Sequence, residues 1–115
     1  MIILTGASGG IGQEILSSLS TLDEVVAIYN KKIPDNVSRD NITPYHLDLT
    51  SEQDISQFVE SMKSGFSKIT LVHAAALARQ NSLAVQFKTD DWDDVMSVNL
   101  RGNFLLTRAL LMPMI

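Results

Sequence analysis

The chain has 115 residues, of which 45% are hydrophobic and 19% charged, with a formal net charge of −4. These values are typical of a single globular domain, and the negative charge argues against nucleic acid or an anionic membrane as a partner. No apolar run reaches the roughly 18 residues of a membrane span, no basic stretch precedes the first apolar residues as in a signal peptide, and the absence of cysteine excludes disulfides, thiol catalysis and thiolate metal sites. We therefore expect a cytoplasmic protein.

A glycine-rich turn, Thr5–Gly12, stands between a short apolar run and a helical pattern. Residues 1–4 are all apolar, as in a strand that is buried on both faces. Apolar residues then follow at helical spacing, namely Ile11, Ile15, Leu16, Leu19 and Leu22. Such a turn directs free backbone N–H groups and the positive end of the helix dipole at whatever lies above it. The pattern therefore predicts a phosphate-binding turn.

Three glycines of this turn have separate predicted roles. Gly6 ends the strand with backbone angles that a Cβ would forbid, while Gly10 gives a pyrophosphate access to the main chain and Gly12 allows close packing of the helix on the strand. An ordinary tight turn between a strand and a helix is the alternative interpretation. The spacing Thr-Gly-x-x-x-Gly-x-Gly resembles the fingerprint of the short-chain dehydrogenase/reductase family.

The second predicted strand covers residues 25–29 and ends in Asn30, Lys31 and Lys32, without a carboxylate. In a doubly wound sheet this tip lies beside the adenosine ribose, where an acidic residue bonds a 2′-hydroxyl and a basic residue accommodates a 2′-phosphate. We therefore expect NADP as the cofactor rather than NAD, with Asn30 and Lys31 near the phosphate. A solvated loop that happens to contain lysines is the alternative.

The third predicted strand, residues 45–47, is followed by Asp48, Leu49 and Thr50. Thr50 and Gln53 have the spacing of a capping box, which predicts that a helix begins there. The buried stripe of that helix is Ile55, Phe58, Val59 and Met62. An Asp-Leu-Thr at this place again resembles the short-chain dehydrogenases, in which the Asp bonds the adenine amino group. Alternatively, Asp48 only steadies the loop.

The fourth predicted strand, residues 69–72, leads into His73 and three consecutive alanines, residues 74–76. Small side chains let the backbone approach a flat ligand, so we expect Ala74 and Ala75 to contact the cofactor. The resembling family usually has Asn-Asn-Ala-Gly here, and this chain keeps the small size but loses the asparagines. We interpret His73 as a structural histidine, because no carboxylate or hydroxyl partner is placed by the spacing.

The last predicted helix covers residues 90–112, with Thr89 as its cap. Four aspartates in its first turns suit the positive end of the helix dipole, so we expect no metal site. Asn99 stands within an apolar stretch, where a buried amide needs partners. The segment around it looks like that of the short-chain dehydrogenases, whose structural and proton-relay asparagine it matches. A local water-binding role is the alternative.

Alternating strand and helix patterns predict an α/β fold. The resemblance implies a Rossmann-like doubly wound parallel sheet of about four strands, in the order 3-2-1-4 with flanking helices, as a single but incomplete domain over residues 1–115. The family's catalytic Ser and Tyr-x-x-x-Lys are missing, since Tyr29 and Tyr45 are followed four residues later by Ile33 and Leu49. The chain alone is therefore predicted to be a poor enzyme or none.

The leading hypothesis is the NAD(P)-binding portion of a short-chain oxidoreductase that transfers hydride between carbonyls and alcohols. A non-catalytic nucleotide-binding module and a homo-oligomeric interaction module are the alternatives. We expect two chains to associate through the edge of strand 69–72, through helix 90–112, or through both. Asn99 is the one catalytic candidate. The cofactor-binding candidates are Gly6, Ser8, Gly9, Gly10, Ile11, Gly12, Asn30, Lys31, Asp48, Leu49, Ala74 and Ala75.

Overall fold

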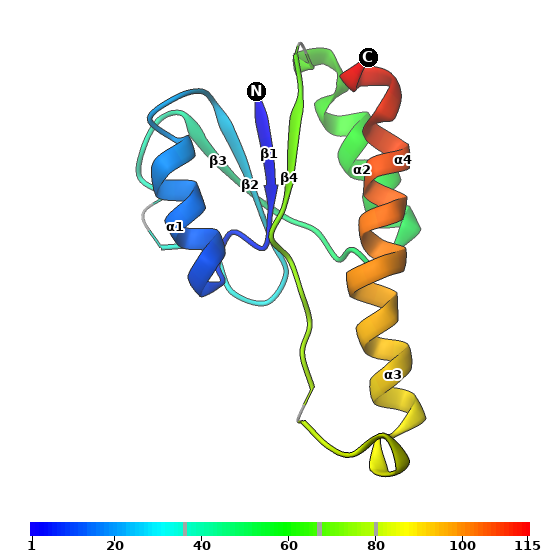
Figure 1. Ribbon diagram of the computed structural model, residues 1–115. Coiled ribbons are helices and arrows are strands. Elements are labelled where there is room, and N and C mark those ends of the chain that lie inside the picture. The colour runs from blue at the N-terminus through cyan, green and yellow to red at the C-terminus, as the bar shows by residue number, and fades with distance from the viewer. Residues whose placement is uncertain (36, 67, 80) are drawn as a thin grey trace.

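The computed structural model describes residues 1–35, 37–66, 68–79 and 81–115, and it shows a four-stranded sheet with helices on its two faces (Figure 1). The strands are β1 (Ile2–Thr5), β2 (Val25–Tyr29), β3 (Ile42–His46) and β4 (Thr70–His73). The helices are α1 (Gly10–Leu19), α2 (Glu52–Met62), α3 (Thr89–Met96) and α4 (Asn103–Met114). Two short 3-10 turns, η1 (Lys63–Gly65) and η2 (Ala84–Gln86), and a π-helix, η3 (Ser97–Gly102), complete the elements. Within the described ranges, every helix is too short or too polar to span a bilayer.

The sheet is parallel throughout and has the order β3-β2-β1-β4, so the predicted fold class and strand order are confirmed. Successive residues of β1 point to opposite faces. Ile3 packs with Phe58 of α2 and Leu106 of α4 in one buried cluster. Leu4 packs with Leu16 of α1 in a second cluster on the other face. Each face of the sheet therefore has its own core, built from helices of this chain.

The apolar stripe of α1 is shorter than predicted. Leu16 is buried, but Ile11 and Leu22 are 77% and 76% exposed. Leu22 lies beyond the end of the helix at Leu19. Ile11 stands in the first turn of α1, just after the exposed glycines of the turn. Assigning both residues to the stripe was wrong because periodicity does not show where a helix leaves the sheet.

Two predicted helix caps are displaced by one residue. The cap of α2 is Ser51, whose hydroxyl accepts a hydrogen bond from the backbone of Asp54 at 3.1 Å, rather than Thr50. The hydroxyl of Thr50 instead donates to Asp48. Thr89 is the first residue of α3, not its cap. Neighbouring hydroxyl residues compete for a cap, and local hydrogen bonds decide between them.

The strand β3 begins at Ile42, earlier than the predicted range 45–47, and it includes Pro44. Proline cannot donate to a ladder, but it is tolerated in an edge strand, and β3 is the edge strand beside β2. Leu47 follows the strand and is buried in the core. The strand β4 begins one residue later than predicted, at Thr70, while Ile69 remains buried.

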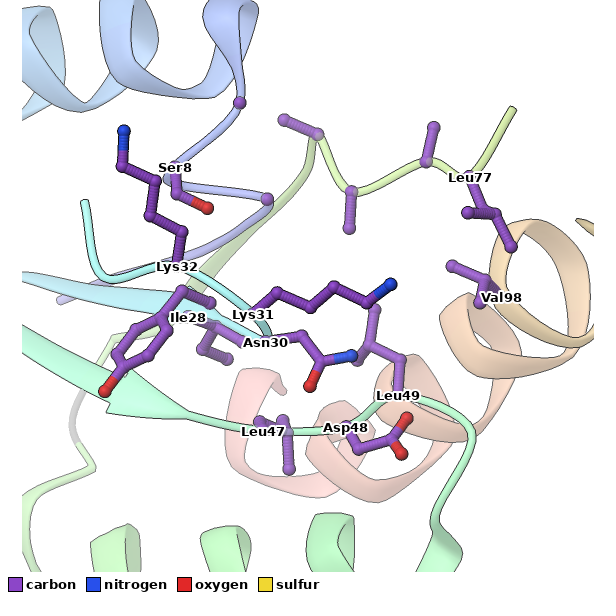
Figure 2. Close-up of a pocket in the computed structure, with 16 residues that line it drawn as sticks. Ser8, Ile28, Asn30, Lys31, Lys32, Leu47, Asp48, Leu49, Leu77 and Val98 are labelled. Carbon is purple, nitrogen blue, oxygen red and sulfur yellow. The ribbon is translucent and has the colours of Figure 1, made fainter. Parts of the chain in front are cut away.

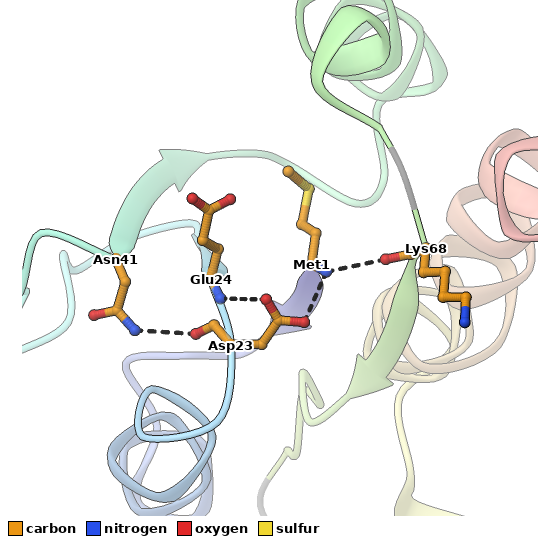
Figure 3. A network of polar contacts seen from close by, with 5 residues as sticks. All are labelled: Met1, Asp23, Glu24, Asn41 and Lys68. Atoms are coloured by element: carbon orange, nitrogen blue, oxygen red, sulfur yellow. Dashed lines mark hydrogen bonds and ion pairs between the residues drawn. The ribbon is translucent and has the colours of Figure 1, made fainter.

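Polar contacts join the amino ends of the strands, opposite the carboxyl ends (Figure 3). The amino group of Met1 donates to Asp23 Oδ2 at 2.9 Å and to the carbonyl of Lys68 at 3.0 Å. Asp23 Oδ1 accepts from the backbone of Glu24, and the amide of Asn41 donates to the Asp23 carbonyl. The hydrogen bond from the Met1 ammonium, helped by that from Glu24, lowers the pKa of the Asp23 carboxyl. One carboxylate thus connects the starts of β1 and β2.

We expect Asp23→Asn to remove a pH-dependent part of the stability. A lowered pKa means that the stabilisation is full above the ordinary value of 3.8 and is lost as the pH falls through the lowered pKa. Thermal unfolding should therefore show a lower midpoint for Asp23→Asn than for the wild type at pH 6, and converging midpoints near the acid limit. Asp40→Asn, at an exposed loop carboxylate, should show no such pH-dependent difference. Parallel curves for wild type and Asp23→Asn would contradict the assignment.

Candidate functional site

A cleft of about 330 Å³ lies at the carboxyl ends of the strands (Figure 2). It is at the point where the sheet reverses its order, since the chain crosses from β3 at one edge to β4 on the other side of β1. In open α/β sheets, ligands bind in the crevice at such a switch point. The cleft is lined by Gly6, Ser8, Gly9, residues 28–32, residues 47–49, residues 74–77 and Val98.

The turn after β1 is held close to its surroundings by two glycines. Gly6 has a φ of +69°, and a Cβ there would lie 2.5 Å from the backbone nitrogen of Ala75. A Cβ on Gly12 would lie 1.7 Å from the carbonyl oxygen of Gly6. No side chain fits at either position. Gly12 therefore packs α1 on the turn itself, rather than on the strand as predicted.

The amino end of α1 is left open to a ligand. Its cap, Gly9, makes no side-chain cap bond, and no acidic residue stands in the first turn. Gly10 is exposed and has free space around its Cα, since a Cβ there would meet nothing within 4 Å. A helix start with free N–H groups and no compensating carboxylate suits an anion such as a phosphate.

Thr5 ties this turn to the loop after β4, and the sequence analysis did not single it out. Its buried hydroxyl accepts hydrogen bonds from the backbone nitrogens of Ala74 and Ala75, both at 3.2 Å. A threonine at the end of a buried strand, just before the glycine turn, is the signal that could have identified it. The bonds hold the alanine loop beside the glycine turn, so both border one cleft.

Two lysines after β2 give this side of the cleft a positive charge. Asn30, Lys31 and Lys32 are exposed and line the cleft. Figure 2 shows Lys32 extending toward Ser8, while Lys31 reaches across toward Leu49. The lining residues include one carboxylate, that of Asp48. Two ammonium groups therefore face the cleft from the tip of β2.

Asp48 steadies the loop after β3, as one of the two interpretations expected. Its Oδ1 accepts from the backbone nitrogen of Thr50 at 2.9 Å and from the Thr50 hydroxyl at 2.7 Å. The other carboxylate oxygen of Asp48, Oδ2, accepts no hydrogen bond from the described residues. Leu49 lies next to it in the lining, with Gly102 packed closely against its Cβ and carbonyl.

Asn99 holds the loop after β4 in place. Its Oδ1 accepts from the backbone nitrogen of Leu77 at 2.7 Å, and its Nδ2 donates to the Leu77 carbonyl at 2.9 Å. The backbone carbonyl of Asn99 accepts from Asn103 Nδ2 at 2.9 Å. Asn99 lies in the π-helix η3, and its neighbour Val98 lines the cleft. The amide therefore reaches the cleft through Leu77, and its side chain does not line the cleft itself.

Two other polar side chains near the site, His73 and Arg79, have partners within the protein. His73 Nε2 is 2.9 Å from Thr107 Oγ1, and partial burial lowers the pKa of the imidazole, which fits the predicted structural role. Arg79 pairs with Asp94 at 2.8 Å and Asp91 at 3.5 Å. No cluster of three metal-ligating side chains occurs in the part of the chain that the structure describes.

The cleft brings together most of the predicted cofactor-binding residues, namely Gly6, Ser8, Gly9, Asn30, Lys31, Asp48, Leu49, Ala74 and Ala75. Gly10, Ile11 and Gly12 do not line it: Gly12 lies under the turn, and the side chain of Ile11 is exposed. Lining residues that the sequence did not indicate as site residues include Leu77 and Val98. They come from segments distant in sequence, so only the fold reveals them.

The family model described as short chain dehydrogenase matches residues 1–115. The chain belongs to the short-chain dehydrogenase family. It is 32% identical to the 3-oxoacyl-(acyl-carrier-protein) reductase FabG of Rickettsia bellii, covering 97% of this chain and 47% of that protein. The corresponding reductase of Thermotoga maritima is 30% identical, with 98% and 49% covered. This chain thus spans about half the length of these two relatives.

Solved structures share the fold. Serine dehydrogenase from Escherichia coli matches with a TM-score of 0.85 and 27% identity, over 99% of this chain and 56% of that one. A closed form of serine dehydrogenase complexed with NADP+ matches with a TM-score of 0.86 and 27% identity, over 99% and 49%. A short-chain dehydrogenase from Leptospira borgpetersenii with bound NAD+ has a TM-score of 0.86 at 23% identity, over 96% and 44%.

We expect Gly12→Ala and Gly10→Ala to differ sharply in stability. The Cβ of Gly12→Ala would collide with the backbone of Gly6, and forced overpacking costs about 1–3 kcal/mol or more. Gly10→Ala places its Cβ in open space, and we expect its free energy of unfolding to stay within about 1 kcal/mol of the wild type. Urea unfolding followed by circular dichroism compares the two. Equal losses would show that the close approach at Gly12 is not what constrains the turn.

Proposed function

We propose that residues 1–115 form the dinucleotide-binding portion of a short-chain oxidoreductase, as a single, incomplete domain. The observation that supports this most directly is the uncapped glycine turn at the switch point of the sheet, next to two lysines. The match of the whole chain to the family model agrees with it. The parent protein would transfer hydride between a nicotinamide cofactor and a carbonyl or alcohol.

Each wall of the cleft has one role in this proposal. The N–H groups of Gly10 and Ile11, together with the Ser8 hydroxyl, hold the pyrophosphate, because the helix start presents free donors there. Asp48 and Leu49 border the adenine, with the free Oδ2 as acceptor for an amino group. The small side chains of Ala74 and Ala75 leave room for the cofactor along the loop after β4.

The proposed cofactor is NADP. Lys31 and Lys32 line the cleft at the tip of β2 (Figure 2), and the one carboxylate among the lining residues, Asp48, follows β3 rather than β2. A 2′-phosphate would find two ammonium groups and the Asn30 amide there. Solved relatives contain either NAD+ or NADP+, so the preference is argued from these side chains.

In this role, residues 1–115 bind the cofactor but do not supply the catalytic proton donor of the family. Neither tyrosine has a lysine four residues later, and Asn99 acts as a positioning residue whose amide holds Leu77. A non-catalytic nucleotide-binding module is the second candidate, because the cleft is built without the missing groups. The cytoplasmic location expected from the sequence stays a prediction.

We also propose that the chain forms homo-oligomers. The surface of helix 89–114 carries exposed apolar side chains, with Leu100 61%, Phe104 56% and Met112 78% exposed. The strand β4 is an edge of the sheet, since β1 is its one neighbour, and unpaired edges favour association. Light scattering at high protein concentration should show species larger than the monomer, and a monodisperse monomer would contradict the proposal.

We expect NADPH to bind more tightly than NADH, and a lysine of the cleft to decide the difference. Lys31→Glu should weaken NADPH binding about tenfold or more, equal to ~1.4 kcal/mol, because it replaces a phosphate contact with repulsion, and should leave NADH binding within about twofold. Lys68→Glu, at an exposed position outside the cleft, is the charge-matched control. Isothermal titration measures the binding of NADPH and of NADH to the wild type and to both variants. Equal affinities of the wild type for NADPH and NADH would overturn the choice of NADP, and no binding of either would overturn the proposed function.

We expect residues 1–115 to gain activity from a second chain. Alone, the protein lacks a general acid, which contributes roughly 10²–10⁴ in rate, so NADPH oxidation with a set of carbonyl compounds should be at background. Adding a separately expressed C-terminal half of a relative that carries Tyr-x-x-x-Lys should raise the rate at least about a hundredfold. The matched control carries Phe for that Tyr. Binding of NADPH without rescue would favour the non-catalytic module.

A further inference from the structure

The two lysines of the cleft stand on a short exposed span of chain, residues 30–33, which belongs to no helix or strand. Its near end is fixed by Tyr29, the last residue of β2. At its far end the chain passes through Pro34, which is buried. A span that is fixed at both ends leaves its side chains fewer positions, so ordering them around a ligand costs less entropy. The contacts at the far end therefore bear on how well Lys31 and Lys32 hold a phosphate.

The side chain of Gln13 fastens this far end to α1. Its Oε1 accepts a hydrogen bond from the backbone nitrogen of Asp35 at 3.1 Å, and its Nε2 donates to Asp35 Oδ2 at 3.5 Å. The same Nε2 donates to the carbonyl of Ser8 at 3.4 Å. Because a helical side chain points back toward the start of its helix, Gln13 reaches the glycine turn from its place near the start of α1. One amide therefore joins the lysine span to the turn that contains Ser8.

Polar contacts, more than packing, hold the loop after β2 against α1. A cavity of about 200 Å³ is lined by both, and most of its lining side chains are polar: Gln13, Ser17, Ser20, Asp35, Ser38 and Arg39. Near the end of α1, the hydroxyl of Ser20 accepts from Arg39 at 2.8 Å, and the carbonyl of Ser20 accepts from the amide of Asn41 at 2.6 Å. Those bonds fix the return of the chain to β3. Gln13 is the side chain of α1 that anchors the loop next to the lysines.

We propose that Gln13 is a positioning residue for the cofactor, and that it sets the spacing between the turn that holds the pyrophosphate and the lysine span that holds the 2′-phosphate. This role rests on the proposed function. The lining of the cleft does not include Gln13, so it acts through Ser8 and Asp35. A ligand with both phosphate groups engages both segments, and its affinity depends on how well they are held together. A ligand with the pyrophosphate alone engages one segment.

The test compares Gln13→Met with the wild type by isothermal titration with NADPH, NADH, adenosine 2′,5′-bisphosphate and ADP. Methionine keeps the length of the side chain and removes the amide. We expect the affinities for NADPH and the bisphosphate to fall about fivefold, because the ligand itself must then order the lysine span. The affinities for NADH and ADP should stay within about twofold of the wild type. Ser18→Met, at an exposed residue of α1, is the matched control and should bind all four ligands as the wild type does.

A second pair of substitutions rebuilds the contact with its polarity reversed. Gln13→Glu alone places a carboxylate beside that of Asp35 and should lower the affinity for NADPH relative to NADH. Adding Asp35→Asn restores the net charge of the wild type. The introduced carboxylate then accepts from the backbone nitrogen of residue 35 and from the introduced amide, so the double variant should recover most of the lost preference for NADPH. A role in folding alone would weaken NADPH and NADH together and would give no such recovery.

Hydrogen exchange of the wild type tests the contact without any variant. The backbone N–H of Asp35 should exchange slowly in the protein without ligand, because it is bonded to Gln13. Exchange as fast as in an unstructured loop would show that the contact does not persist in solution and would overturn the proposal. Circular dichroism checks that each variant is folded before its affinities are compared.

The affinities separate the positioning role from the proposed function. A folded Gln13→Met whose ratio of NADPH to NADH affinity stays within about twofold of the wild type overturns the role of Gln13 and leaves the proposed function standing. A wild type that binds NADPH no more tightly than NADH overturns that role together with the choice of NADP. A wild type that binds neither dinucleotide overturns the proposed function as well.

Discussion

The structure depends on a close approach of backbone to backbone at the end of β1. Gly6, in a left-handed conformation, lets the turn lie against the backbone of Ala75, and the missing Cβ of Gly12 lets α1 lie against the carbonyl of Gly6. The buried hydroxyl of Thr5 completes the contact with two hydrogen bonds to the loop after β4. The end of β1, the start of α1 and the sequence-distant loop after β4 therefore meet in close backbone contact. This leaves the start of α1 uncovered, and the free N–H groups there are what an anionic ligand would use.

The other walls of the cleft are held by a different means. The loop after β3 buries Leu47 and Leu49 in the core, and polar and close contacts to one helical segment also hold this loop and the loop after β4. Asn99 fixes Leu77, and Gly102 and Arg101 fix the loop at Leu49 and Thr50. The strand order places β3 and β4 at opposite edges of the sheet, and η3 contacts the loops that follow both strands. The glycine turn thus leaves the N–H groups at the start of α1 uncovered through its backbone geometry, while η3 holds two walls of the cleft in place.

The fold could be predicted from the sequence because its signals are local. Strands read as apolar runs, helices as stripes around Leu16 or Phe58, and the family fingerprint gave the strand order that the structure confirms. The predicted ends of strands and helices were wrong where tertiary contacts decide them. Pro44 lies within β3, which an edge strand tolerates. Ser51 caps α2 because the hydroxyl of Thr50 is already bonded to Asp48. The lining residues Leu77 and Val98 could not be predicted, since nothing in their local sequence distinguishes them from ordinary apolar residues.

A half-length family member can fold because each face of its sheet is covered by its own helices. The cluster around Ile3, Phe58 and Leu106 and the cluster around Leu4 and Leu16 are both complete within the described residues. Two surfaces at the side of the sheet stay uncovered: the outer edge of β4 and the exposed apolar face of the helical segment 89–114. Uncovered apolar surface and open strand edges favour association. The segment η3, which contacts the loops at Leu77 and Leu49, carries part of that surface at Leu100.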